Sequence, residues 1–140
     1  MTPVLLLLLA GALVVVCGIF VAAEFAFITV NRASVEAAAS EGDPTAMGVS
    51  KALRSLSTQL SGAQLGITIT NLAIGFLAEP SIATLIFPTL LRLGVPERSA
   101  DTVSIMVSLG VATATTMLFG ELLPKNLAIA RPMGTARAVQ

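Results

Sequence analysis

Three long stretches of this sequence carry no charged residue, and they constrain the fold more than any other feature. Residues 1–23, 55–78 and 102–120 contain no Asp, Glu, Lys or Arg. Each stretch approaches the ~20 apolar residues that cross the ~30 Å hydrocarbon core of a bilayer as one helix. Because backbone groups in that core must hydrogen-bond within the protein, helices are the simplest solution. We therefore predict an all-α integral membrane protein.

The remaining composition excludes several classes of function. Eight acidic and eight basic residues give a formal net charge of zero, which argues against a basic nucleic-acid binder. The chain has no His and a single Cys, Cys17, and it contains no phosphate loop, HExxH motif or nucleophile elbow. We expect neither a nucleic-acid partner nor an enzyme.

We predict one transmembrane domain over residues 1–140, with spans near residues 4–30, 58–78 and 102–120. The first run reads as a retained anchor, since no Lys or Arg precedes Arg32 as a signal peptide would require. Acylation at Cys17 is disfavoured because Val16 stands where a small residue is needed.

Two further segments read as peripheral helices. Residues 33–56 contain Gly42-Asp43-Pro44, a pattern typical of one helix ending and the next beginning. Residues 81–95 are apolar but short for a crossing and contain Pro88, so we expect a re-entrant or peripheral hairpin there.

The positions of the basic residues favour one orientation. With three spans and the N-terminus outside, six of the eight Lys and Arg residues fall in cytoplasmic segments. If residues 81–95 also crossed, the split would be five against three. We therefore expect a multi-pass protein of the cell's inner (plasma) membrane with a cytoplasmic C-terminus.

Polar residues within the second span form a stripe. Gln64, Thr68, Asn71 and Gly75 recur at helical spacing on one face. Asn71 is either part of a binding site or a hydrogen-bonding contact between helices, and the neighbouring Gly62/Gly66 pair is typical of close helix packing. Both interpretations stay open.

The end of the third span combines several oxygen ligands. In an α-helix Pro124 cannot donate to the Gly120 carbonyl, which leaves that carbonyl free beside the Glu121 carboxylate. With Asn71 and the hydroxyl of Thr116 or Thr68, this set suits Mg²⁺, Ca²⁺ or Na⁺. The alternative is that Pro124 only ends the helix and that Glu121 pairs with Lys125.

Glu24 is the other carboxylate within apolar sequence. Intramembrane carboxylates usually face the bundle interior or water and mark ion pathways. A surface position, with the side chain reaching water, is the alternative.

Several motifs together resemble a known family. They are Phe20-Val-Ala-Ala-Glu-Phe-Ala-Phe-Ile28, Gln64-Leu-Gly-Ile-Thr68, Leu77-Ala-Glu-Pro80 and Gly120-Glu-Leu-Leu-Pro-Lys125 followed by Arg131-Pro132. In this order they resemble the transmembrane domain of the CorC/cyclin M (CNNM) magnesium transporters.

That resemblance implies a homodimeric, Na⁺-dependent Mg²⁺ exporter with three transmembrane helices. It also implies that a cytoplasmic CBS-type regulatory domain belongs to the full-length protein, outside this chain. The metal site it implies is formed by Gly120 and Glu121, by Asn71, and by the end of helix one near Ala22, Ala23 and Glu24. The family often has Ser where Ala22 or Ala23 stands, so a hydroxyl ligand is absent or replaced by a backbone carbonyl.

We hypothesise that Mg²⁺ enters a negatively charged cavity open to the cytoplasm and is held by Glu121, Asn71, a Thr hydroxyl and the Gly120 carbonyl. Na⁺ would be the coupling ion. The rival hypothesis is a non-transporting membrane scaffold or Mg²⁺ sensor built on the same site.

Overall fold

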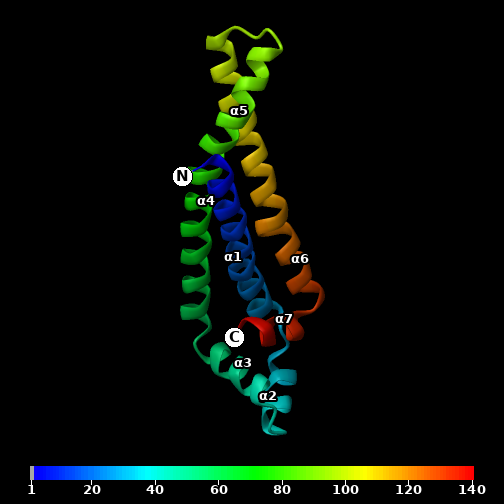
Figure 1. The fold of residues 1–140 in the computed structure, drawn as a ribbon. Coiled ribbons are helices and arrows are strands. Elements are labelled where there is room, and N and C mark those ends of the chain that lie inside the picture. Colours follow the sequence, from blue (N-terminus) through cyan, green and yellow to red (C-terminus); the bar gives the residue numbers. More distant parts are fainter. Residues whose placement is uncertain (1) are drawn as a thin grey trace.

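The computed structural model describes residues 2–140, and these residues are helical throughout apart from short connections (Figure 1). Met1, the first residue of the predicted domain, lies outside the described residues. The helices, in chain order, are α1 (Pro3–Thr29), α2 (Arg32–Ser40), α3 (Pro44–Arg54), α4 (Leu56–Arg92), α5 (Glu97–Thr115), the π-helical segment η1 (Thr116–Leu122), α6 (Leu123–Ala130) and α7 (Pro132–Val139).

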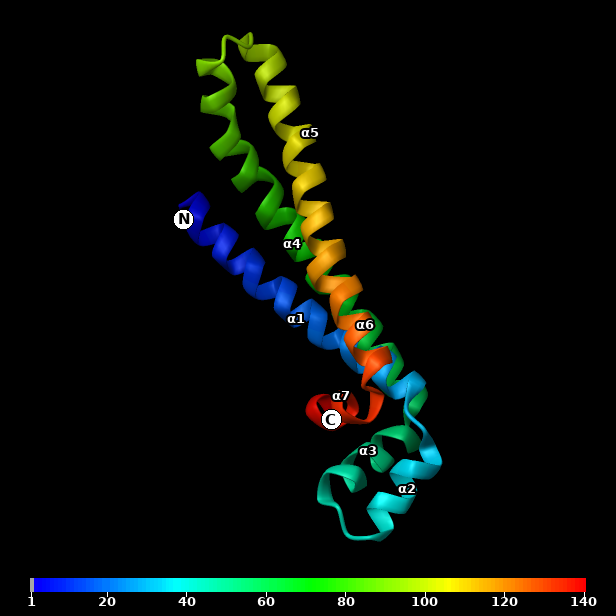
Figure 2. The ribbon, with the colours of Figure 1, turned by 90° about the vertical axis from the view of Figure 1, so that its right-hand side faces the viewer.

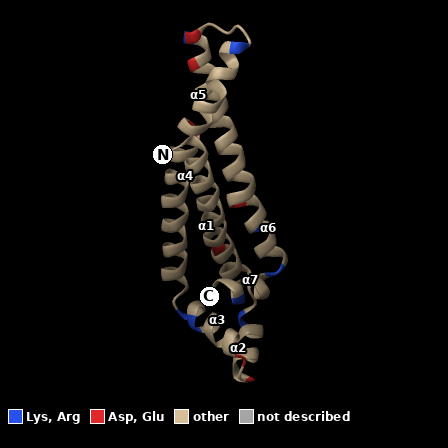
Figure 3. Ribbon diagram, viewed as in Figure 1, with Lys and Arg blue, Asp and Glu red and all other residues tan. Residues whose placement is uncertain are grey.

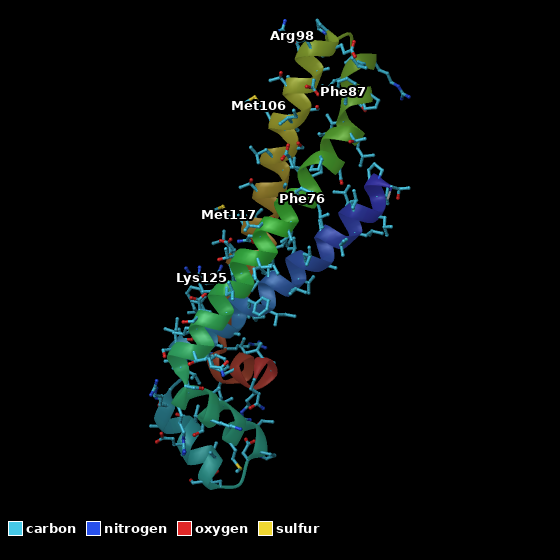
Figure 4. All side chains as sticks on the ribbon, turned by 90° about the vertical axis from the view of Figure 1, so that its left-hand side faces the viewer. Phe76, Phe87, Arg98, Met106, Met117 and Lys125 are labelled. Atoms are coloured by element: carbon cyan, nitrogen blue, oxygen red, sulfur yellow. The ribbon has the colours of Figure 1, made fainter. Side chains whose placement is uncertain are left out.

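Three helical stretches are long and apolar enough to cross a membrane, which confirms the all-helical membrane fold. They are α1, α4 and the continuous run from Glu97 to Ala130 through α5, η1 and α6. The charged residues lie mostly towards the two ends of the molecule, with few between them (Figure 3). Phe76 and Met106 are 81% and 70% exposed, as expected for side chains that face lipid. Figure 4 shows Met106 and Met117 pointing away from the other helices.

Residues 81–95 differ from our expectation of a separate peripheral or re-entrant element. They continue α4 as far as Arg92 and then turn at Gly94 into α5. Pro80 and Pro88 each remove only one N–H from the helix, and the hydroxyls of Ser81 and Thr84 donate to the carbonyls of Leu77 and Pro80. Because α5 packs alongside, the helix continues past both prolines. The resulting α4–α5 hairpin extends beyond the start of α1 (Figures 1 and 2).

The third span also continues past Gly120, where we expected it to end. Instead of stopping, the helix widens into η1, and the N–H of Leu123 donates to the carbonyl of Leu118 in the i→i+5 pattern. Pro124 follows directly and has no N–H with which to restore the α-helical pattern at Gly120. The local chemistry predicted from Pro124 therefore produces a π-helical segment rather than a helix end.

The peripheral region predicted over residues 33–56 consists of α2 and α3. Asp43 caps α3, because its carboxylate accepts hydrogen bonds from the backbone N–H groups of Thr45 and Ala46, at 3.0 and 3.2 Å. Gly42 before it has a φ of 90°, which suits glycine. Asp43 also pairs with Arg137 of α7 at 2.6 Å, which joins the peripheral helices to the end of the chain.

Two glycines let the membrane helices approach closely. A Cβ on Gly18 would lie 2.9 Å from Cγ of Pro124, and a Cβ on Gly66 would lie 2.7 Å from the Phe20 ring. Gly62 has no such neighbour. Only Gly66 of the Gly62/Gly66 pair is therefore used for packing within this chain.

Candidate metal site

A chain of polar side chains crosses the bundle at the level of η1. Cys17 of α1 donates its S–H to Oδ1 of Asn71 in α4 at 3.3 Å, and Nδ2 of Asn71 donates to Oε1 of Glu121 in η1 at 3.1 Å. Cys17 is fully buried, whereas Asn71 and Glu121 are half-buried. These three residues, from three different helices, form what we call the Asn71–Glu121 junction.

One cavity lies on the α2–α3 side of the junction and has a volume of about 550 Å³. Glu24, Gln64 and Thr68 line it together with Asn71 and Glu121. Lys125 also lines this cavity, so two carboxylates face one ammonium group there. We call this space the Glu24 cavity.

A second cavity of about 390 Å³ lies on the hairpin side of the same pair. Its polar lining is Glu79, Thr113 and Thr116, again with Asn71 and Glu121. We call it the Glu79 cavity. Since Asn71 and Glu121 line both spaces, their hydrogen bond lies where the two cavities meet.

The other predicted ligands do not lie together at one place in the structure. Thr68 lines the Glu24 cavity and Thr116 the Glu79 cavity, and each hydroxyl donates to a carbonyl of its own helix at 2.9 Å. Gly120 is buried, and a Cβ there would face Val14 and Cys17 of α1. Ala23 packs against an apolar cluster at the α2–α3 end and lines neither cavity.

Pro124 and Lys125 have separate contacts. Pro124 packs on Gly18 of α1. The Nζ of Lys125 lies 4.6 Å from the centre of the Phe25 ring, a cation–π distance. Within residues 2–140 the structure shows no ion pair between Glu121 and Lys125, so the alternative pairing is not formed. The Glu121 carboxylate therefore faces Asn71 instead.

The described residues contain no group of three His, Cys, Asp or Glu side chains able to hold a metal. A cation at the junction would therefore meet one carboxylate and neutral oxygens.

Comparison with known proteins identifies the family. The model of the cyclin M transmembrane N-terminal domain matches residues 8–140. The chain belongs to this cyclin M family. Among relatives, it is similar to UPF0053 protein MT1890 of Mycobacterium tuberculosis, with 48% identity over 87% of this chain, and to UPF0053 protein YhdT of Bacillus subtilis, with 37% identity over 88% of this chain.

This cyclin M domain spans about 27% of the length of each of these two relatives. An uncharacterized protein of Mycobacterium tuberculosis, MT1889, is 39% identical over 92% of this chain, which in turn covers 36% of that relative. The resemblance of its motifs to this family is thereby confirmed.

Sequence reasoning missed two residues of this cyclin M domain that line or support the junction. The sequence predicts no role for Cys17 at the site, although Cys17 shares a helical face with Val21 and Glu24. Glu79 lies directly after the predicted span of residues 58–78, although it continues the stripe of Gln64, Thr68, Asn71 and Gly75 by one more turn. Extending each helical face by one turn would have identified both.

Proposed function

We propose that this chain is the membrane domain of a Na⁺-dependent Mg²⁺ exporter and that Mg²⁺ binds at the Asn71–Glu121 junction. The observation that carries the proposal is the hydrogen bond between these residues at the meeting of two polar cavities. An ion that passes from one cavity to the other has to replace this bond. The family membership supports a role in Mg²⁺ transport.

The chemistry of the exchange follows from the hydrogen-bond donors. Nδ2 of Asn71 now points at Glu121, and Oδ1 points at Cys17. A cation that binds Glu121 repels the N–H groups of Nδ2 and favours a rotated amide that offers Oδ1 instead. Asn71 would then serve as a ligand with the ion present and as a donor to Glu121 without it.

The direction of transport is part of the same proposal. Mg²⁺ enters the Glu24 cavity from the cytoplasm, with the N-terminus of the chain outside, and leaves through the Glu79 cavity. Na⁺ entry drives the cycle if the two ions favour different conformations or compete for Glu121. A homodimer in the plasma membrane, with a CBS-type regulatory domain in the full-length protein, completes the proposal.

The test is a flux measurement in liposomes that contain a Mg²⁺-sensitive dye and carry an imposed Na⁺ gradient. Glu121→Gln should lower the flux and the Mg²⁺ affinity about 1,000-fold, because the attraction between two unit charges 4 Å apart is about 4 kcal/mol at an effective dielectric constant of 20, and every 1.4 kcal/mol is a factor of ten. Glu97→Gln, in the exposed hairpin, is the matched control and should leave both quantities unchanged. Unchanged affinity in Glu121→Gln would place the site elsewhere.

A non-transporting scaffold or Mg²⁺ sensor is the second candidate, and the polar chain through Cys17, Asn71 and Glu121 favours it. An ion bound at these residues would hold three helices together without being released. Normal Mg²⁺ binding by the intact protein without any Na⁺-dependent flux would support this candidate over the exporter.

A further inference from the structure

A groove unrelated to the two polar cavities runs between α1, η1, α6 and α7. It has a volume of about 640 Å³, within the range of small-molecule sites. In Figure 2, α7 turns away from the direction of α6 and passes below α1. We call it the Arg131 groove, and its lining includes Ile19, Ala22, Phe119, Leu127, Arg131 and Thr135.

The groove is apolar along its length and charged at one end. Val15, Ile19 and Ala22 of α1 form one wall, and Phe119 and Leu127 form the other. Arg131 is the single charged residue in the lining and is exposed. The one ion pair found within residues 2–140 joins Arg137 to Asp43, so no carboxylate of the described chain neutralises Arg131.

The charged end of the groove corresponds to a lipid headgroup, and its apolar length corresponds to an acyl chain. Arg131 follows α6 at the end of the third membrane-length stretch, where a headgroup region is expected. Val15 lies near the middle of α1, and the wall from Val15 to Ala22 extends about 10 Å along the helix axis. The groove therefore leads from a cationic interface position into the hydrocarbon region.

From this complementarity we infer that the Arg131 groove binds one anionic phospholipid. Its phosphate lies at the Arg131 guanidinium beside the Thr135 hydroxyl, and one acyl chain lies against Ile19 and Leu127. Other lipid tails are as apolar as these side chains, so the acyl chain adds little to the selectivity of the groove for one lipid over another. The preference for this lipid over its neighbours comes from Arg131, and we expect it to be about fivefold.

The absence of Trp and Tyr from the sequence makes a direct test possible. In Leu127→Trp the indole is the only Trp and reports the groove, and in Met106→Trp it reports the lipid-facing side of α5, away from the groove. Each variant is reconstituted in phosphatidylcholine bilayers with a minor fraction of phosphatidylglycerol, and either one lipid or the other carries brominated chains that quench Trp fluorescence. If Leu127→Trp does not fold, Leu123→Trp on the same wall replaces it.

The expected result is an excess of quenching by brominated phosphatidylglycerol at position 127, equivalent to about fivefold preferential binding, and none at position 106. Arg131→Gln should abolish the excess, Arg131→Lys should retain most of it, and Arg98→Gln at the hairpin tip (Figure 4) should have no effect. Quenching that follows bulk composition at both positions would overturn the proposal. Protection of position 127 from both lipids would also overturn it, because a second copy or another protein segment would then cover the groove.

Discussion

The Asn71–Glu121 junction and the α4–α5 hairpin both contain polar side chains between helices, but they use them differently. In the hairpin, Ser81, Ser104 and Ser108 are buried, and each hydroxyl donates to a carbonyl of its own helix, at 2.6 to 2.8 Å. At the junction, the side chains of Cys17, Asn71 and Glu121 bond to one another across three helices.

This difference separates a packing role from a binding role. A hydroxyl bonded to its own backbone stays satisfied whatever passes nearby, and its small size lets two helices approach. An amide bonded to a carboxylate on another helix is satisfied only while that partner stays in place. An incoming cation can therefore compete for the junction, whereas it has nothing to displace in the hairpin.

The largest difference between the two regions should appear when one polar group is removed from each. Asn71→Leu deletes the amide at the junction, so Mg²⁺ affinity and flux should fall by at least about tenfold, as for the loss of a group that directly supports a metal. Ser108→Ala, its counterpart in the hairpin, should change both by less than about twofold, because only a bond to its own helix is lost. Isothermal titration with Mg²⁺ and liposome flux measure the two quantities. Equal losses in both variants would remove the distinction between the regions.

The next largest effect should be on stability, at the close contact between Gly18 of α1 and Pro124 of α6. Gly18→Ala places a Cβ 2.9 Å from the Pro124 ring, whose position is fixed by the helix. We expect a loss of about 1–3 kcal/mol in stability, as for overpacked cores. Gly11→Ala on the same helix meets no atom within 4 Å and should cost nothing. Thermal unfolding in detergent compares the two, and equal melting temperatures would show that α1 and α6 readjust freely.

Pro124→Ala tests the origin of η1. The new N–H can donate to a carbonyl of the preceding turn, so the helix should return to the α-helical pattern and turn Glu121 away from Asn71. We expect a loss in Mg²⁺ affinity of about tenfold with unchanged or higher thermal stability. Leu123→Ala beside it leaves the backbone donors as they are and is the control. An unchanged affinity would mean that η1 does not depend on the proline.

The smallest effect lies outside the membrane helices, at Asp43. The hydroxyl of Thr45 and the backbone N–H of Ala46 lower the pKa of this carboxyl below its ordinary value of 3.8, with a smaller contribution from Arg137. A lowered pKa in the folded state means that the stabilisation is complete above about pH 4 and is lost as the pH falls through the lowered value. The hydrogen-exchange protection factors in α3, which are corrected for the intrinsic pH dependence of exchange, should therefore fall below pH 4 in the wild type. Asp43→Asn should show no such fall, and a parallel pH dependence of the protection factors in both would contradict this assignment.

Much of this architecture followed from the sequence because it depends on local chemistry. The three charge-free runs predicted three membrane-length helices, and Gly42-Asp43-Pro44 predicted the boundary between α2 and α3. The α4–α5 hairpin could not be predicted from the sequence. Pro80 and Pro88 weaken the helix locally, whereas the packing of α5 that offsets this loss is a tertiary contact. For the candidate site, the sequence grouped Asn71 with Glu121, and the structure brings their side chains together; ligation of a metal stays a prediction. The helical face that carries Cys17 could be identified from the sequence, but its hydrogen bond to Asn71, 54 residues away, could not, because that contact depends on how α1 and α4 pack.

The unbroken course of α4 has a mechanical consequence. Asn71 lies 15 residues from Leu56 and 21 residues from Arg92, near the middle of one helix of 37 residues. The arm from Asn71 to Arg92 is therefore about 30 Å long, and a tilt of about 5° around Asn71 would displace its tip by roughly 3 Å. A rearrangement of the Asn71 amide that tilts the helix would thus move the Arg92 end of α4 by more than the rearranged amide itself moves.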